Sequence, residues 1–82
     1  MFADKTVAII GQGYIGLPLS IAATKAGWNV IGIDNSSAKV EQISNGISPV
    51  IDVSNADINW AIDKDLYQIT SDFSEISKAK IV

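Results

Sequence analysis

The feature that most restricts the fold of this chain is a short apolar run followed by three glycines with the spacing G-x-G-x-x-G. Residues 6–10 (TVAII) are apolar or β-branched, as in a strand that is buried on both faces of a parallel sheet. The glycine turn covers residues 11–16, and residues 14–26 carry small and apolar side chains at helical spacing. A second apolar run, at residues 30–33, ends at Asp34. This order of strand, turn, helix, strand and acid is typical of a site for the pyrophosphate and adenosine ribose of a dinucleotide.

The rest of the chain continues the alternation of helices and strands. The expected elements are a helix that Asn35 or Ser36 caps and Asn45-Gly46 ends, a helix over 55–64, a strand over 66–70, a short helix, and a strand that opens at 80–82. Capping boxes for two of these helices are Ser54-x-x-Asp57 and Asp72-x-x-Glu75. Strands that alternate with helices imply a parallel sheet with right-handed crossovers, here in the order 3-2-1-4.

The predicted fold class is therefore α/β, with a Rossmann-type parallel sheet of about four strands flanked by helices. We expect this sheet to be incomplete, because the chain stops within its fourth strand. Residues 1–82 are interpreted as the N-terminal part of a dinucleotide-binding domain, with no second domain present. The residues expected to face the sheet are Ile15, Leu19, Ala22, Ala23 and Ala26 from the first helix, and Val40, Ile43, Ile58, Ala61 and Ile62 from the next two.

The composition excludes several kinds of site. The 82 residues contain no cysteine and no histidine, which excludes disulfides, thiolate or imidazole metal sites, and catalysis by either side chain. There is no arginine, the lysines are scattered and the net charge is −3, so we expect no nucleic-acid partner. No stretch reaches the roughly 18 apolar residues of a membrane span. We expect a soluble cytoplasmic protein with no membrane association, and no catalytic residue or metal site within this chain.

Each glycine of the turn has its own predicted task. Gly11 permits a tight exit from the strand, and Gly13 lets the backbone approach a pyrophosphate without a Cβ in the way. Gly16 allows the helix to lie close to the sheet. The N–H groups around Gly13, Tyr14 and Ile15, with the helix dipole, would bind the phosphates. The alternative is a strand-to-helix turn that binds no ligand.

Asp34 and Lys39 are the candidates for contacts with the adenosine ribose. The Asp34 carboxylate would accept hydrogen bonds from both ribose hydroxyls and would repel a 2′-phosphate, which favours NAD over NADP. The alternative for Asp34 is a solvated carboxylate at the end of a strand. Lys39 follows five residues later and could reach the ribose, although from the sequence alone a solvated helix lysine is the simpler interpretation.

Two other nucleotide-binding motifs fit less well. A P-loop is excluded because no Gly-Lys-Ser/Thr follows the turn. A Rossmann-type methyltransferase also has an acid at the end of its second strand, but its turn usually reads G-x-G-x-G, and Ile15 stands where the third glycine would be.

Several motifs together resemble the N-terminal segment of the nucleotide-sugar dehydrogenases, which oxidise UDP-glucose, GDP-mannose and UDP-N-acetylmannosamine at C6. The most specific is G-Y-I-G-L-P at residues 13–18, within the string GQGYIGLPLSIAATKAGWNVIGID. It is followed by Lys39-Val40, by NGISPV and by a late Leu-x-x-x-Thr-Ser-Asp, so the resemblance covers residues 5–82. Leu17-Pro18 is closer to the branch that oxidises N-acetylated or mannose-type sugars. Asp52 stands where glutamate is more usual in this family.

The resemblance implies NAD as the cofactor. The residues that match the family's cofactor site are Gly11, Gly13, Tyr14, Ile15 and Gly16 in the pyrophosphate turn, with Asp34 and Lys39 at the ribose. It also implies a parent enzyme that oxidises the C6 alcohol of a UDP- or GDP-sugar to a carboxylate in two NAD-dependent steps, through a cysteine-bound intermediate. That cysteine is not among these residues, so this chain is expected to bind the ADP-ribose part of NAD without catalysis.

Two further expectations concern assembly and function. An unpaired fourth strand would be an exposed apolar edge, which predicts a homo-oligomer that forms through the edge of the sheet. The alternative to a dehydrogenase segment is a non-catalytic module that uses the same fold for sensing or as a scaffold.

Overall fold

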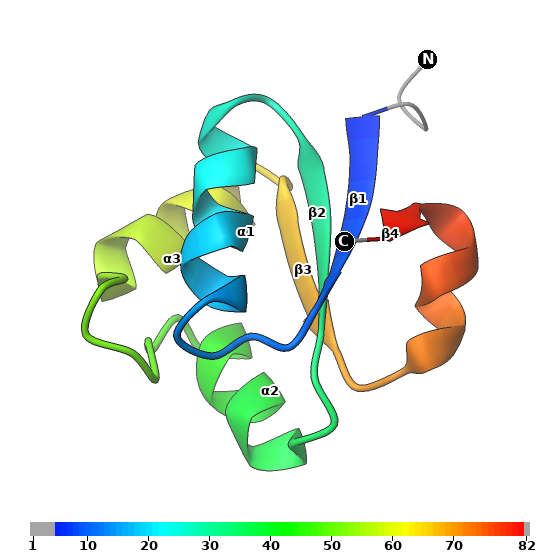
Figure 1. The fold of residues 1–82 in the computed structure, drawn as a ribbon. Coiled ribbons are helices and arrows are strands. Elements are labelled where there is room, and N and C mark those ends of the chain that lie inside the picture. The colour runs from blue at the N-terminus through cyan, green and yellow to red at the C-terminus, as the bar shows by residue number, and fades with distance from the viewer. Residues whose placement is uncertain (1–4, 82) are drawn as a thin grey trace.

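The computed structural model describes residues 5–81, which form one parallel sheet with helices on both faces (Figure 1). The elements are β1 (Thr6–Ile10), α1 (Gly16–Lys25), β2 (Asn29–Ile33), α2 (Ser37–Ser44), α3 (Asn55–Asp63), β3 (Tyr67–Thr70), the 3-10 helix η2 (Phe73–Lys78) and β4 (Lys80–Ile81). The order β3-β2-β1-β4 confirms the predicted fold class and strand order. Val82, which the prediction placed in the fourth strand, lies outside the described residues.

The register of the sheet brings the carboxyl ends of its first three strands to one edge. Ile10 of β1 pairs with Ile33 of β2, and Ile33 pairs with Thr70 of β3. Two backbone hydrogen bonds continue this ladder past the strands, from Gly11 N to Ile33 O at 2.7 Å and from Asp34 N to Thr70 O at 3.1 Å. The glycine turn and Asp34 therefore leave the sheet side by side.

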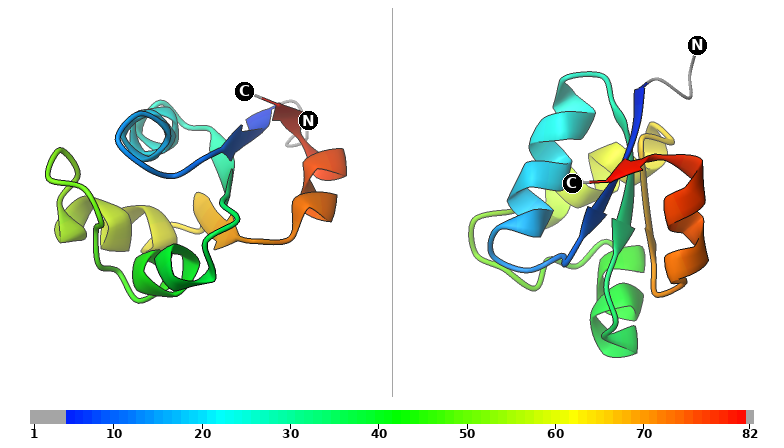
Figure 2. Two further views of the ribbon diagram at one scale, coloured as in Figure 1. Left: turned by 60° about the horizontal axis from the view of Figure 1, so that its bottom comes forward. Right: turned by 45° about the vertical axis from the view of Figure 1, so that its right-hand side comes forward.

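The two faces of the sheet are covered unequally. The three α-helices lie on one face and η2 lies on the other (Figure 2). Because side chains alternate along a strand, Val7 and Ile9 join the larger core under the α-helices, while Ala8 packs with Ile31 and Ile33 against the side of η2. The larger core also buries Leu17, Ile43 and Ile58 completely. The larger core thus includes Leu17, which follows the glycine turn directly in the sequence.

The predicted inward face of the first helix is mostly wrong: Ala23 packs against the core, but Ala22 and Ala26 are exposed. Ile15 and Leu19 are 84% and 43% exposed, and the buried residues of α1 are Leu17, Ser20, Ile21 and Thr24. The spacing of the apolar residues predicted the wrong face because the buried face contains two polar residues. The Ser20 hydroxyl donates to Gly16 O and the Thr24 hydroxyl to Ile21 O, so both hydroxyls are satisfied within the helix and can pack inward.

The later helices begin as predicted. The hydroxyl of Ser36 accepts from Lys39 N, that of Ser54 accepts from Asp57 N, and the Asp72 carboxylate accepts from Ser74 N. The inward residues Ile43, Ile58 and Ala61 are buried, whereas Val40 and Ile62 are only partly covered. The third strand begins one residue late, at Tyr67. Among residues 5–81, none of the helices has the length and apolar character needed to cross a bilayer.

Candidate functional site

The glycine turn presents backbone N–H groups at the start of α1. The helices α2 and α3 and the 3-10 helix η2 each have a side chain that caps their first turn, but the N-cap of α1 is Ile15, which provides no such hydrogen bond. Within residues 5–81, no group accepts a hydrogen bond from the N–H of Gly13, Tyr14 or Ile15. Such a helix start has donors and a positive dipole end available for an anion.

The three glycines of the motif are needed for different reasons. Gly11 has φ +87°, a left-handed conformation that only glycine adopts readily. A Cβ at Gly16 would overlap the carbonyl oxygen of Gly11, so the start of α1 lies directly against the residue that follows β1. At Gly13 a Cβ would meet only Lys39 Nζ, at 3.9 Å. The fold therefore requires Gly11 and Gly16, but it does not require Gly13.

Asp34 lies directly beyond β2 and is only 6% exposed. Its Oδ2 accepts from Gln12 N at 2.8 Å and from Lys39 Nζ at 3.1 Å, and its Oδ1 accepts from Ser36 N at 3.0 Å. Burial alone would raise the pKa of this carboxyl. The two backbone donors and the charged lysine outweigh burial and hold the pKa below its ordinary value of 3.8. Asp34 is thus a fixed, ionised carboxylate next to the glycine turn.

Lys39 is an ion-pair partner of Asp34 and not a freely solvated lysine. Its side chain is 31% exposed, and its Nζ lies between the Asp34 carboxylate and the backbone at Gly13. The N-cap of Ser36 sets this position, because it starts α2 so that Lys39 falls in the first turn, facing back to the end of β2. The sequence alone could not distinguish these two environments.

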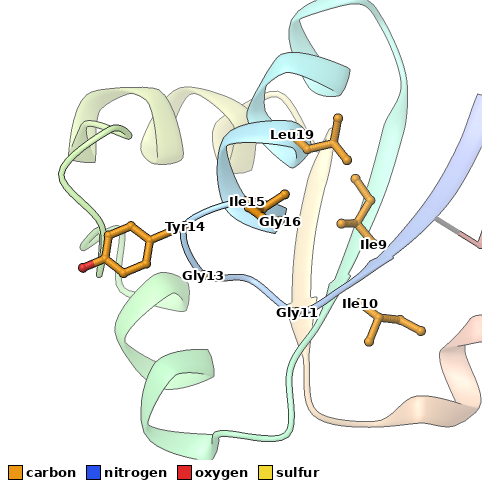
Figure 3. Close-up of a pocket in the computed structure, with 8 residues that line it drawn as sticks. All are labelled: Ile9, Ile10, Gly11, Gly13, Tyr14, Ile15, Gly16 and Leu19. Atoms are coloured by element: carbon orange, nitrogen blue, oxygen red, sulfur yellow. The ribbon is translucent and has the colours of Figure 1, made fainter.

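Two hollows meet at Ile10 and Gly11. One, of about 300 Å³, has Asp34, Lys39 and Phe73 in its wall. The other, of about 440 Å³, lies along the start of α1 (Figure 3). Figure 3 shows Ile15 and Leu19 beside this second hollow, while the Tyr14 ring, 76% exposed, points away from them. An extended ligand that crosses the turn would occupy both hollows, at the carboxyl ends of the strands, where open α/β sheets bind nucleotides.

The structure brings all seven predicted residues to this edge, namely Gly11, Gly13, Tyr14, Ile15, Gly16, Asp34 and Lys39. It adds residues that the sequence reasoning missed. Phe73 and Asn35 border the smaller hollow, and Gln12 is completely buried beneath the turn. One signal for Gln12 was present in the sequence, since a glycine inside a strand, here Gly32, often marks the close approach of another group.

The arrangement fits a dinucleotide. It has uncapped N–H donors for a pyrophosphate, an open backbone at Gly13 where a Cβ would stand in the way, and an ionised carboxylate next to them for a ribose. Within the described residues there is no cluster of three or more acidic, histidine or cysteine side chains that could bind a metal ion.

Comparison with known proteins identifies the family of this chain. Residues 5–82 match the family model described as the UDP-glucose/GDP-mannose dehydrogenase family, NAD binding domain. The chain is 34% identical over 77 residues to the GDP-mannose 6-dehydrogenase of Pseudomonas putida, covering 93% of this chain and 18% of that protein. It is 37% identical over 46 residues to the UDP-N-acetyl-D-mannosamine dehydrogenase of Pyrococcus horikoshii, covering 56% of this chain and 11% of that protein.

A solved structure shows the same fold. The chain superposes on a ternary complex of GDP-mannose dehydrogenase from Pseudomonas aeruginosa with a TM-score of 0.79 and 30% identity, over 85% of this chain and 16% of that one. The chain thus spans less than a fifth of the length of these relatives. By sequence and by fold, it belongs to the UDP-glucose/GDP-mannose dehydrogenase family, and it matches the NAD-binding domain of that family.

Proposed function

We propose that the glycine turn and the Asp34–Lys39 pair form the NAD site of this protein. The N–H groups of Gly13, Tyr14 and Ile15 bind the pyrophosphate, while Gly11 and Gly16 shape the turn that presents them. The observation that carries the proposal is the position of Asp34, an ionised carboxylate held next to the helix start that has no side-chain cap. NAD supplies a hydride acceptor when it is bound, and these residues bind and orient its ADP-ribose part.

Lys39 and Asp34 act together in this proposal. Of the three donors that the described residues offer to the carboxylate, Lys39 is the only side chain, and its ammonium carries three hydrogens. It can therefore keep its bond to Asp34 and donate a second one to a ribose oxygen. The carboxylate accepts three hydrogen bonds from the described residues and has room for about one more, since two carboxylate oxygens offer about four acceptor positions. It would therefore accept from one ribose hydroxyl, and not from both as the sequence predicted.

The same pair favours NAD over NADP. A 2′-phosphate would have to approach the Asp34 carboxylate, and the sequence contains no arginine to neutralise it. The nearest cation, Lys39, is already paired with Asp34 at 3.1 Å. We expect NADP to bind more weakly than NAD for this reason.

For the whole protein we propose the activity that the names of its relatives suggest. It would oxidise the C6 alcohol of a UDP- or GDP-sugar to a carboxylate with two NAD, and residues 1–82 would supply the cofactor half of that site. Because these residues contain neither cysteine nor histidine, they would bind NAD without turnover. NAD and nucleotide sugars are intracellular metabolites, so the proposed activity implies a cytoplasmic location.

We also propose that the chain self-associates through the edge of its sheet. In the described sheet, β4 pairs with β1 and with no other strand, and an open edge is a template for pairing with another copy. Sedimentation velocity over a range of protein concentrations tests this, and a monomer at every concentration would refute it.

Calorimetric titration with NAD, NADP and ADP-ribose tests the cofactor site. We expect NAD and ADP-ribose to saturate one site and NADP to bind more weakly. Asp34→Ala should lower the NAD affinity by about 10- to 150-fold, since a hydrogen bond to a charged group contributes about 1.5–3 kcal/mol. Asp57→Ala is the matched control, because that carboxylate pairs with Lys25 on the outside of the helices.

Two results would contradict the proposal. A folded wild-type chain that binds no dinucleotide would favour the sensing or scaffold alternative. Equal NAD affinity in the Asp34 and Asp57 variants would show that Asp34 is not part of the site.

A further inference from the structure

The side chain of Gln12, the residue between the first two glycines, is completely buried beneath the turn. Its Nε2 donates to Ile9 O at 2.9 Å and to Gly11 O at 3.1 Å. Its Oε1 accepts from the Tyr67 hydroxyl at 2.7 Å. Gln12 Oε1 also lies 2.9 Å from the Ser20 hydroxyl, whose one hydrogen is shared between Gln12 Oε1 and Gly16 O. The two carbonyls can only accept, so the orientation of the amide is fixed, and all of its hydrogen-bonding positions are used.

These contacts connect Gln12 to three elements. Ile9 belongs to β1, Ser20 to α1 and Tyr67 to β3, and the strand between them, β2, has Gly32 at the point where the amide lies. A Cβ at Gly32 would stand 2.7 Å from Gln12 Oε1 and 2.8 Å from the Tyr67 oxygen. The glycine in the middle of β2 therefore provides the space for this buried amide.

The backbone of the same residue reaches the cofactor site. Gln12 N donates to Asp34 Oδ2 at 2.8 Å, to the oxygen that also accepts from Lys39 Nζ. Because the side chain is held on three sides, the Gln12 peptide cannot rotate without breaking buried hydrogen bonds. The direction of this N–H, and with it one oxygen of Asp34, is therefore set from inside the core.

Tyr67 is a permanent donor in this network. Burial, and in addition the negative charge of Asp34, raises the pKa of its hydroxyl well above the ordinary value of 10.0. The hydroxyl therefore stays protonated at neutral pH, and Gln12 Oε1 keeps its hydrogen bond.

We propose that Gln12 is a positioning residue for cofactor recognition: its buried amide, held by Tyr67 and Ser20, fixes the N–H that orients the Asp34 carboxylate toward the adenosine ribose. The inference rests on the proposed role of Asp34 at that ribose. It extends the site to residues on β3 and α1 that no bound cofactor needs to touch.

A purely structural role for Gln12 makes a different prediction. A core residue that only stabilises the fold would change the affinity for every ligand of the turn by the same factor. A residue that orients Asp34 changes the preference for ligands that carry the 2′-hydroxyl over those that lack it. The quantity to measure is therefore the ratio of the affinities for NAD and for its 2′-deoxyadenosine analogue.

The test is calorimetric titration of both ligands into the wild-type chain and two variants. Gln12→Leu removes the amide at similar size, and Tyr67→Phe removes one hydroxyl while it leaves the sequence of the turn intact. We expect the wild-type ratio to be about tenfold or more, as for a hydrogen bond to a charged group. It should fall by at least about threefold in Tyr67→Phe and further in Gln12→Leu, because misoriented hydrogen bonds weaken steeply.

Thr24→Val is the matched control. Thr24 has a buried hydroxyl on the same helix as Ser20, but this hydroxyl donates to Ile21 O, and Thr24 is not among the described hydrogen-bond partners of Gln12. Its loss should lower the melting temperature and leave the affinity ratio unchanged. If Gln12→Leu fails to fold, Tyr67→Phe still provides the comparison.

Hydrogen exchange gives a second measurement that needs no ligand. The amide of residue 12 should lose protection in Tyr67→Phe relative to the amides of β1, because its bond to Asp34 becomes strained. An unchanged affinity ratio in folded Tyr67→Phe and Gln12→Leu proteins overturns the inference and leaves the role of Asp34 intact. A wild-type chain that does not discriminate the two ligands would refute the proposed role of Asp34, and this inference with it.

Discussion

Replacing Gly13 with alanine should abolish most of the affinity for NAD without weakening the fold. The added Cβ would have one neighbour within 4 Å, Lys39 Nζ at 3.9 Å, which is an ordinary van der Waals contact. Gly13 is also not among the residues with positive φ. Nothing within the described chain therefore opposes a methyl group at this position.

The expected effect on stability is small and favourable. A Gly→Ala change at a position whose conformation suits alanine stabilises a protein by about 0.4–1 kcal/mol, because the unfolded chain has fewer conformations to lose. For a domain of this size that corresponds to a rise in melting temperature of about 2–8 °C. Thermal unfolding followed by circular dichroism measures it directly.

The expected effect on binding is large and unfavourable. The proposed site has the pyrophosphate approach the backbone at Gly13, so we expect a methyl group there to hold it away and to cost at least one hydrogen bond to a charged group. That loss is about 1.5–3 kcal/mol, or about 10- to 150-fold in the dissociation constant measured by calorimetry. Stability and affinity would thus change in opposite directions.

Gly16→Ala is the matched comparison, because there the new Cβ would overlap the carbonyl oxygen of Gly11. The turn would have to open, at a cost of about 1–3 kcal/mol, so both the melting temperature and the NAD affinity should fall. The reasoning is refuted if Gly13→Ala binds NAD as tightly as the wild type. It is also refuted if Gly13→Ala loses as much stability as Gly16→Ala does.

Three further predictions concern the fold and its charges. Leu17→Ala, at a fully buried site, should lower the free energy of unfolding by about 2–5 kcal/mol in urea titrations, and a loss below about 1 kcal/mol would contradict the assignment of the core. Lys25→Ala, which breaks the exposed pair with Asp57, should cost at most about 1 kcal/mol in the same titrations. Asp34 has a lowered native pKa, so its contribution to stability is fully present above the ordinary pKa of 3.8 and is lost as the pH falls through the native value. Thermal unfolding across this pH range should therefore show a smaller acid-induced loss of stability in Asp34→Asn than in the wild type. An equal loss in both proteins would contradict the lowered pKa of Asp34.

The edge of the sheet at which the glycine turn meets Asp34 was predictable because its parts are local in the sequence. Gly11, Gly13 and Gly16 are close to one another in the chain, and Asp34 ends the next strand in a βαβ unit whose handedness is nearly invariant. Chain direction and strand order then bring the turn and the acid to the same edge. The capping residues Ser36 and Ser54 were predictable for the same reason, since a cap bonds to an N–H three residues ahead.

The missed features depend on contacts that no local pattern records. The predicted inward face of α1 was mostly wrong because the hydroxyls of Ser20 and Thr24 donate to carbonyls of their own helix, which allows both side chains to pack inward. Lys39 could equally have been solvated, and only the approach of α2 to the end of β2 pairs it with Asp34.

By itself, the sequence determined the α/β class, the strand order and the meeting of the glycine turn with Asp34 at one edge of the sheet, because these follow from spacing, chain direction and handedness. Only the tertiary structure decided how that edge is supported. The N–H of Gln12 reaches a carboxylate 22 residues away, and its amide accepts from a hydroxyl 55 residues away. Partners so far apart in the chain are chosen by packing across the sheet, and the space at Gly32 that admits them exists only once β1, β2 and β3 lie side by side.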